Sequence, residues 1–181
     1  MIRVFLVITS AVTLLVGCSD RKVSVEANVS MTEQQKQKLG DLRVFFAHQS
    51  VGGNILDGVA SLAGSSEIRI VQTENPQDIR PGTIGHARVG ANGDAIGKIR
   101  DFDRLVRSGL GDSVDVAIMK LCYVDITSST NTIAVYEELQ RVFGGLRRDY
   151  PQTKISVATV PLTTRNSGLK GLIRTVLGKN G

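Results

Sequence analysis

Short apolar runs alternate along this chain with longer segments in which apolar residues recur at helical spacing. Runs bounded by Gly, Pro or polar residues indicate buried strands, and apolar residues at every third or fourth position indicate amphipathic helices. The run at residues 42–47 is almost continuously apolar, as in a strand buried on both faces of a parallel sheet. Four strands are predicted, at residues 42–47, 68–71, 114–121 and 155–160.

Helical periodicity fills most of the intervals between these strands. The segment beginning near Ile55 is expected to end at Gly64, and Thr32 is expected to open a short polar helix with a capping box. Strands alternating with helices predict right-handed crossovers. We therefore expect an α/β fold of three layers with a flavodoxin-like parallel sheet of about four strands. The remaining helices are predicted at about 94–106, 132–148 and 169–177.

One interval, residues 72–93, shows no periodicity and contains two prolines and four glycines. It is predicted to be a long loop, and loops of this length in compact domains are typically functional or mobile. His86 lies within it between Gly85 and Ala87. An exposed and inert histidine is the default expectation for that position.

The amino terminus reads as a targeting segment. Arg3 precedes an uncharged apolar run that is too short to cross a bilayer comfortably, and the run ends in Leu15-Val16-Gly17-Cys18. This ending resembles the lipobox of bacterial lipoproteins, which implies removal of residues 1–17 and lipidation of Cys18. Ser19 implies sorting to the outer membrane, facing the periplasm. The alternative is an ordinary secretory signal with a chance Cys. Residues 18–40 then form a tether and short helix, and 41–181 the domain.

Composition excludes several classes of function. Trp is absent and aromatic residues make up 4% of the chain, which argues against an aromatic platform for glycans or single-stranded nucleic acid. The net charge of +5 is scattered, so no nucleic-acid partner is expected. With Cys18 lipidated, Cys122 is alone, which leaves neither a disulfide nor a Cys metal site. The chain matches neither the Walker loop nor the Gly-x-Gly-x-x-Gly motif of nucleotide-binding proteins. Its two histidines are far apart in sequence, so a catalytic zinc is not expected. We therefore predict no cofactor and no metal.

Candidate chemistry gathers where the first strand gives way to a helix, at residues 42–54. Ser50 follows the apolar run, and Gly52 and Gly53 allow close approach to the backbone. A turn of this kind can expose a nucleophilic hydroxyl and present N–H donors to a developing oxyanion. Alternatively, Ser50 or Asn54 simply caps the helix.

Three segments together resemble the successive blocks of a divergent SGNH/GDSL-type hydrolase: 46–52 (FAHQSVG), 89–94 (VGANGD) and 119–125 (MKLCYVD). The resemblance implies that Ser50 is the nucleophile and that the Gly90 N–H is an oxyanion donor. The third block normally supplies an Asn donor, which is missing here. Asn92 is either its substitute or a turn residue.

The general base is the larger departure from that family. SGNH enzymes take a His, with an Asp three residues before it, from near the carboxyl end, and this chain has no His after His86. His48 is close to Ser50 in sequence, but side chains two residues apart need not meet. It is expected either to bind substrate or to be a locally hydrogen-bonded structural histidine.

Residues after the third predicted strand have two interpretations each. Asp125 is expected to face the cleft, where it would bind substrate hydroxyls or orient a base, or else to stabilise a turn. Tyr123 is a substrate platform or a half-buried loop aromatic. Lys120, inside an apolar strand, is expected to pair with Asp125 or Asp115.

The sequence thus predicts an exported, lipid-anchored serine hydrolase, an esterase acting on acylated envelope or extracellular carbohydrate. The missing Asp/His pair is expected to lie beyond Gly181, so the 181-residue chain should have little esterase activity. The alternative is a catalytically inactive SGNH-like lipoprotein that binds an envelope glycan or small ligand.

Overall fold

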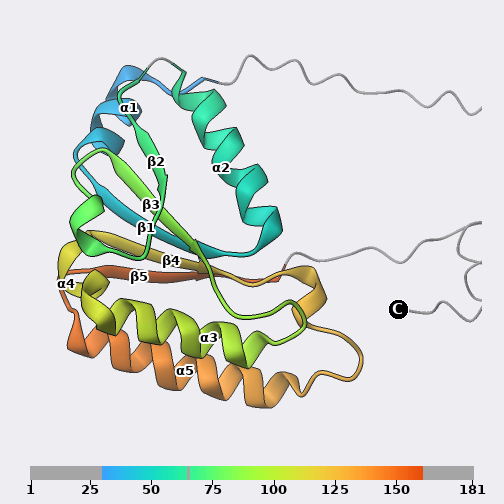
Figure 1. Cartoon of the computed structure of the whole chain (residues 1–181). Helices are drawn as coiled ribbons and strands as arrows, with labels where there is room; N and C mark the ends of the chain where they lie inside the picture. The colour runs from blue at the N-terminus through green and yellow to red at the C-terminus, as the bar shows by residue number, and fades with distance from the viewer. Residues whose placement is uncertain (1–29, 65, 161–181) are drawn as a thin grey trace, which may run out of the picture.

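The computed structural model describes residues 30–64 and 66–160 (Figure 1). The predicted signal peptide, the lipidation site Cys18 and the predicted helix at 169–177 lie outside these residues. Among the described helices, none combines the length and hydropathy that a membrane span requires.

A five-stranded, all-parallel sheet with the order β2-β3-β1-β4-β5 forms the centre of the fold. Helices α1 and α2 cover one face and α3 and α5 the other (Figure 1). This arrangement confirms the predicted three-layer, flavodoxin-like α/β fold. The strands are β1 (Arg43–His48), β2 (Arg69–Gln72), β3 (Thr83–Arg88), β4 (Val116–Lys120) and β5 (Lys154–Ala158).

The helices lie close to their predicted positions. Thr32 and Gln35 form the predicted capping box of α1, and α2 ends at Gly64, whose φ is +60°. Asp94 caps α3 by accepting a hydrogen bond from the Gly97 N–H. The helices are α1 (Glu33–Gly40), α2 (Ser50–Ala63), α3 (Ala95–Leu105), α4 (Gly111–Ser113) and α5 (Thr132–Asp149), with short helical turns at Pro76–Asp78, Val106–Leu110 and Tyr123–Asp125.

The prediction of a loop over residues 72–93 is wrong, because this interval contains β3. The strand lies between β1 and β2 and is hydrogen-bonded to both. Gly85 and His86 interrupt its apolar pattern, which hid it from periodicity. Gly85 is closely packed, since a Cβ there would lie 2.5 Å from the Ile79 side chain, which would have to move. The sheet therefore has five strands rather than about four, and His86 belongs to it.

Strand β1 is buried on both faces, as its apolar run predicted. Phe45 and Ala47 belong to the larger core cluster, which is shared with α3 and α5. Val44 and Phe46 point the other way, into a smaller cluster with Leu56 of α2. Because β1 is central and packed on both sides, the turn that follows it is held in a fixed position.

Candidate functional site

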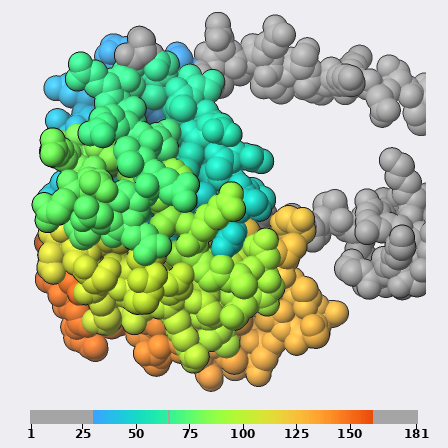
Figure 2. All heavy atoms as spheres, in the orientation of Figure 1, coloured from blue at the N-terminus to red at the C-terminus, as the bar shows by residue number. Residues whose placement is uncertain are grey.

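The carboxyl ends of the parallel strands bring three chain segments to one edge of the sheet. Strand β1 ends at His48, opposite Arg88 at the end of β3. In the space-filling view the start of α2 (cyan), the loop after β3 (green) and the loop after β4 (yellow-orange) lie along the right-hand side (Figure 2). Open α/β sheets bind their ligands at this edge.

Ser50 is the first residue of α2, and it is exposed. The helix is capped by the backbone of Gln49 without any side-chain hydrogen bond, so neither Ser50 nor Asn54 acts as the cap. The Gln49 amide donates instead to the carbonyl oxygens of Val89, at 2.9 Å, and Gly90, at 2.6 Å. The turn that carries Ser50 is thereby tied to the loop after β3, and Ser50 itself stays exposed.

His48 is buried, and both of its ring nitrogens are engaged. Nδ1 lies 2.6 Å from the Gln49 carbonyl oxygen and Nε2 lies 3.1 Å from Nδ1 of His86. Because a carbonyl only accepts, Nδ1 of His48 carries a hydrogen and donates it. When both rings are neutral, Nε2 of His48 then accepts from the Nδ1–H of His86. Of the two interpretations of His48, this geometry supports the locally hydrogen-bonded structural histidine.

His86 is neither fully exposed nor isolated, which corrects the default expectation. It is half-buried in β3, beside Phe46 of β1. Its ring centroid lies 5.1 Å from that of His48. Burial, and secondarily the charge of neighbouring His48, lowers the pKa of His86 from its usual 6.5. The two histidines are far apart in sequence, and only the pairing of β3 with β1 brings them together.

The lowered pKa of His86 predicts acid sensitivity. As the pH falls below 6.5, the unfolded chain takes up this proton before the folded chain does, so the folded state loses stability. We expect the free energy of unfolding, measured by urea denaturation, to fall between about pH 7 and pH 5, and to fall less in His86→Asn, which keeps an N–H donor but no titrating ring. An equal fall in both proteins would contradict this role for His86.

A buried ion pair joins α3 to the loop after β4. Lys98 Nζ of α3 lies 2.7 and 2.8 Å from the Asp125 carboxylate oxygens, and both side chains are 0% exposed. The same carboxylate accepts from the N–H groups of Cys122, at 2.6 Å, and Gly93, at 3.0 Å. The predicted substrate-binding role of Asp125 therefore has no support in this geometry, since protein donors occupy its oxygens.

Sequence reasoning missed Lys98, although a signal was present. Lys98 falls on the series of apolar positions that faces the core from α3, between Ala95 and Phe102. A lysine at such a position needs a buried partner. The pattern reveals that need but does not identify Asp125, which lies 27 positions further along the chain.

Gly90 is held in place by its surroundings. Its φ is +53°, and a Cβ would lie 2.8 Å from the backbone nitrogen of Lys98. Its N–H donates to the Asp101 carboxylate at 3.0 Å. To serve as an oxyanion donor, as the family resemblance implies, this N–H would have to exchange Asp101 for the oxyanion.

Asn92 is oriented by Lys98, whose Nζ donates to the Asn92 Oδ1 at 3.2 Å. An amide held through its oxygen directs its nitrogen elsewhere, so the Nδ2 hydrogens remain a donor group. Tyr123, at the start of the loop after β4, is 53% exposed. The Asn92 amide and the Tyr123 side chain are thus both accessible at the edge of the sheet where the strands have their carboxyl ends.

The predicted partners of Lys120 are wrong. Asp115 binds Arg43, with a shortest distance of 2.7 Å, and Asp125 binds Lys98. The Lys120 side chain is buried, and its Nζ donates to the Leu121 carbonyl oxygen at 3.1 Å. Among the described residues no carboxylate lies within salt-bridge distance of it.

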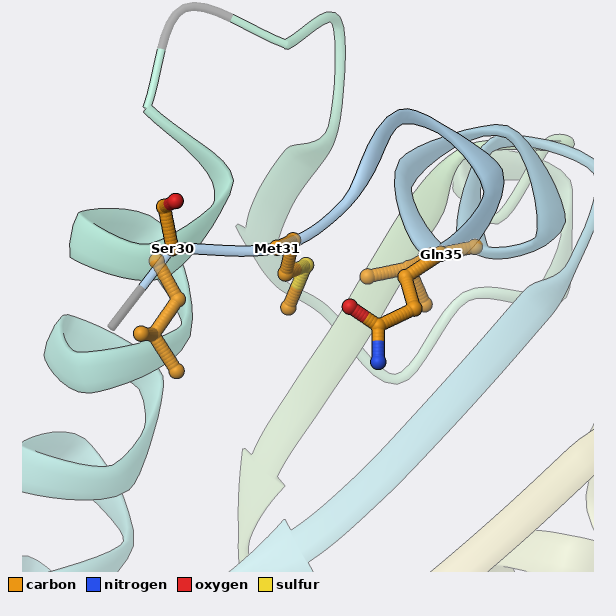
Figure 3. Close-up of a pocket in the computed structure, with 5 residues that line it drawn as sticks. Ser30, Met31 and Gln35 are labelled. Carbon is orange, nitrogen blue, oxygen red and sulfur yellow. The ribbon is translucent and has the colours of Figure 1, made fainter. Parts of the chain in front are cut away.

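In the described part of the chain, pockets also lie away from this edge. One, of about 340 Å³, lies between α1 and the end of α2 that is far from Ser50, and it is lined mainly by apolar side chains (Figure 3). Another, of about 430 Å³, lies beside α1 and Pro81. The part of the chain that the structure describes contains no cluster of three or more His, Cys, Asp or Glu residues able to hold a metal ion.

Comparisons with known protein families, with curated proteins and with solved structures found no match to this chain. The site is therefore interpreted from its own geometry.

Proposed function

We propose that this protein is a serine ester hydrolase in which Ser50 is the nucleophile. The observation that carries the proposal is the position of Ser50: an exposed hydroxyl on the first residue of a 14-residue helix, directly after the central strand. Such a position combines access for substrate with the positive end of the helix dipole. The SGNH/GDSL-type resemblance of the three sequence blocks supports the same assignment.

In the proposed reaction the Ser50 oxygen forms a bond to the carbonyl carbon of an ester, and the carbonyl electron pair moves to its oxygen. The free N–H groups in the first turn of α2 and the amide of Asn92 are the candidate donors for that oxyanion. Collapse expels the alcohol, which takes up the serine proton, and water then hydrolyses the acyl-enzyme.

The serine proton needs an acceptor, and the structure provides no histidine for it. The chain contains two histidines, both among the described residues, and no hydrogen bond joins either one to Ser50. His48 uses both ring nitrogens within the protein. We therefore propose that this chain hydrolyses esters slowly because Ser50 has no general base. His48 and His86 instead position the turn between β1 and α2.

A base supplied from solution tests this proposal. We expect imidazole to accelerate hydrolysis of a small acyl ester about tenfold or more, a part of the ~10²–10⁴-fold effect of a positioned base. Imidazole itself cleaves activated esters, so the rate with Ser50→Ala under the same conditions is subtracted. Ser61→Ala, which alters another exposed serine of α2, is the matched control and should keep the full rate.

A second candidate function is ligand binding at the same edge without catalysis. The observation that favours it is the hydrogen bond from the Gly90 N–H to Asp101, which occupies a donor that a hydrolase would use. In the imidazole experiment, equal rates for the unsubstituted protein and Ser50→Ala would reject the hydrolase and favour this binder of an envelope glycan or small ligand.

We further propose that the protein is exported and anchored through a lipid on Cys18 at the outer membrane, and that its substrates are acylated envelope or extracellular carbohydrates. The lipobox-like residues before Cys18 support this location. Labelled palmitate should enter the expressed protein and be lost in Cys18→Ala. Cys122→Ala, which removes the other cysteine, should retain the label, and label retained in Cys18→Ala would refute the anchor.

A further inference from the structure

Lys120 is a buried cation that the proposed reaction does not use. It is the last residue of β4, at the carboxyl edge of the sheet, and is 6% exposed. Its ammonium group has three hydrogens, of which one is donated to the Leu121 carbonyl oxygen. Within the described residues the other two have no hydrogen-bond partner, and no carboxylate balances the charge. Burial of an unbalanced charge is costly.

The register of the sheet places Lys120 in a row of basic side chains. Ala47 of β1 is paired with Met119 of β4, so the next pair along is His48 and Lys120. On its other side His48 is paired with Arg88. Residues paired across a parallel sheet point to the same face. Arg88, His48 and Lys120 therefore cross three strands on the face that α2 covers.

The amino terminus of α2 packs on the middle residue of this row, His48. A Cβ on Gly52, in the first turn of α2, would lie 2.2 Å from the His48 ring, so the two are in contact. That first turn contains no acidic residue and no side-chain cap. The positive end of the α2 dipole therefore lies beside His48, the neighbour of Lys120 across the sheet, and no described carboxylate binds Lys120.

The described residues supply no carboxylate to Lys120, and we look to a bound ligand for the negative charge. A carboxylate or phosphate group would accept the remaining ammonium hydrogens and balance the charge.

We propose that Lys120 binds an anionic group, a carboxylate or a phosphate, carried by the substrate of the Ser50 site. The substrates are then acyl esters of negatively charged carbohydrates rather than of neutral ones. The identity of the ligand as a substrate rests on the proposed hydrolase, whereas the anion site itself does not.

Calorimetric titration of the full chain tests the anion site without any turnover. The probes are D-glucuronate, glucose 6-phosphate and neutral glucose. We expect an anionic sugar to bind more tightly than glucose, and Lys120→Met, which keeps the apolar volume, to weaken that binding about tenfold or more. The sugar that binds identifies the anion as carboxylate or phosphate. Ser50→Ala should bind normally, so failure of the hydrolase would leave this result intact.

Lys154→Met is the matched control. Lys154 lies on the same face of the sheet at the other end of β5, and it is exposed. Its replacement should change binding by no more than about twofold, as for an exposed surface charge. Thermal unfolding confirms that both variants are folded. Binding that is equal for the three sugars, absent for all of them, or unchanged in folded Lys120→Met would overturn the proposal.

Discussion

Replacing Asp125 by alanine will lower the free energy of unfolding by about 3–5 kcal/mol, because it leaves the Lys98 ammonium buried without its partner. The substitution also removes the acceptor for the N–H groups of Cys122 and Gly93. Those two groups belong to the loops on either side of the Ser50 turn, so both loops lose their common anchor. Urea denaturation measures the change directly.

Two controls separate the buried pair from ordinary charge effects. Glu33→Ala removes the exposed Lys36–Glu33 pair, in which Glu33 is 90% exposed, and should cost about 0–1 kcal/mol. The double variant Lys98→Met/Asp125→Leu, which removes both charges, should be much more stable than Asp125→Ala. A cost for Asp125→Ala no larger than that of Glu33→Ala would show that the pair does not hold the loops.

Adjacent glycines in α2 are predicted to respond to alanine in opposite directions. Gly52→Ala would place a Cβ 2.2 Å from the His48 ring, which is itself held between Phe46 and two hydrogen bonds. We expect a loss of about 1–3 kcal/mol from this overpacking. A Cβ on Gly53 would have no neighbouring atom within 4 Å, so Gly53→Ala should stabilise the helix by about 0.5–1 kcal/mol.

A second substitution tests the cause of the Gly52 effect. If the His48 ring is the obstacle, His48→Ala combined with Gly52→Ala should cost clearly less than the sum of the two single changes. Additive costs, or stabilisation by Gly52→Ala alone, would contradict the contact between the turn and the ring. Both glycine variants are measured by urea denaturation at one pH, because the lowered pKa of His86 predicts that stability depends on pH.

Sequence pattern predicted the parts of the fold that rest on local, periodic signals. Strands β1 and β4 have near-continuous apolar runs, β5 is a short apolar-rich segment ended by Pro161, and α5 has an apolar stripe, so the predicted bounds of each lie within two residues of the observed ones. Strand β3 was missed because Gly85 and His86 break its pattern. Its position is fixed by pairing with β1 and β2, which is long-range information that a local window does not contain.

In the candidate site, too, local features are predictable from the sequence and long-range contacts are not. The exposed position of Ser50 follows from the turn between β1 and α2, and this was predictable. The pairs His48–His86 and Lys98–Asp125 join residues 38 and 27 positions apart, and only the folded sheet brings them together. Asp125 was accordingly expected in the cleft, whereas its carboxylate lies inside the protein.

Covalent labelling tests the central claim, that Ser50 is a reactive nucleophile, most directly. A serine-directed fluorophosphonate forms a bond to the nucleophilic oxygen with loss of fluoride, and mass spectrometry of the digested protein locates the adduct. We predict slow labelling that is accelerated by imidazole, reaches one adduct per chain on Ser50 and is lost in Ser50→Ala but not in Ser61→Ala. No adduct under these conditions, or an adduct that persists in Ser50→Ala, would contradict the account.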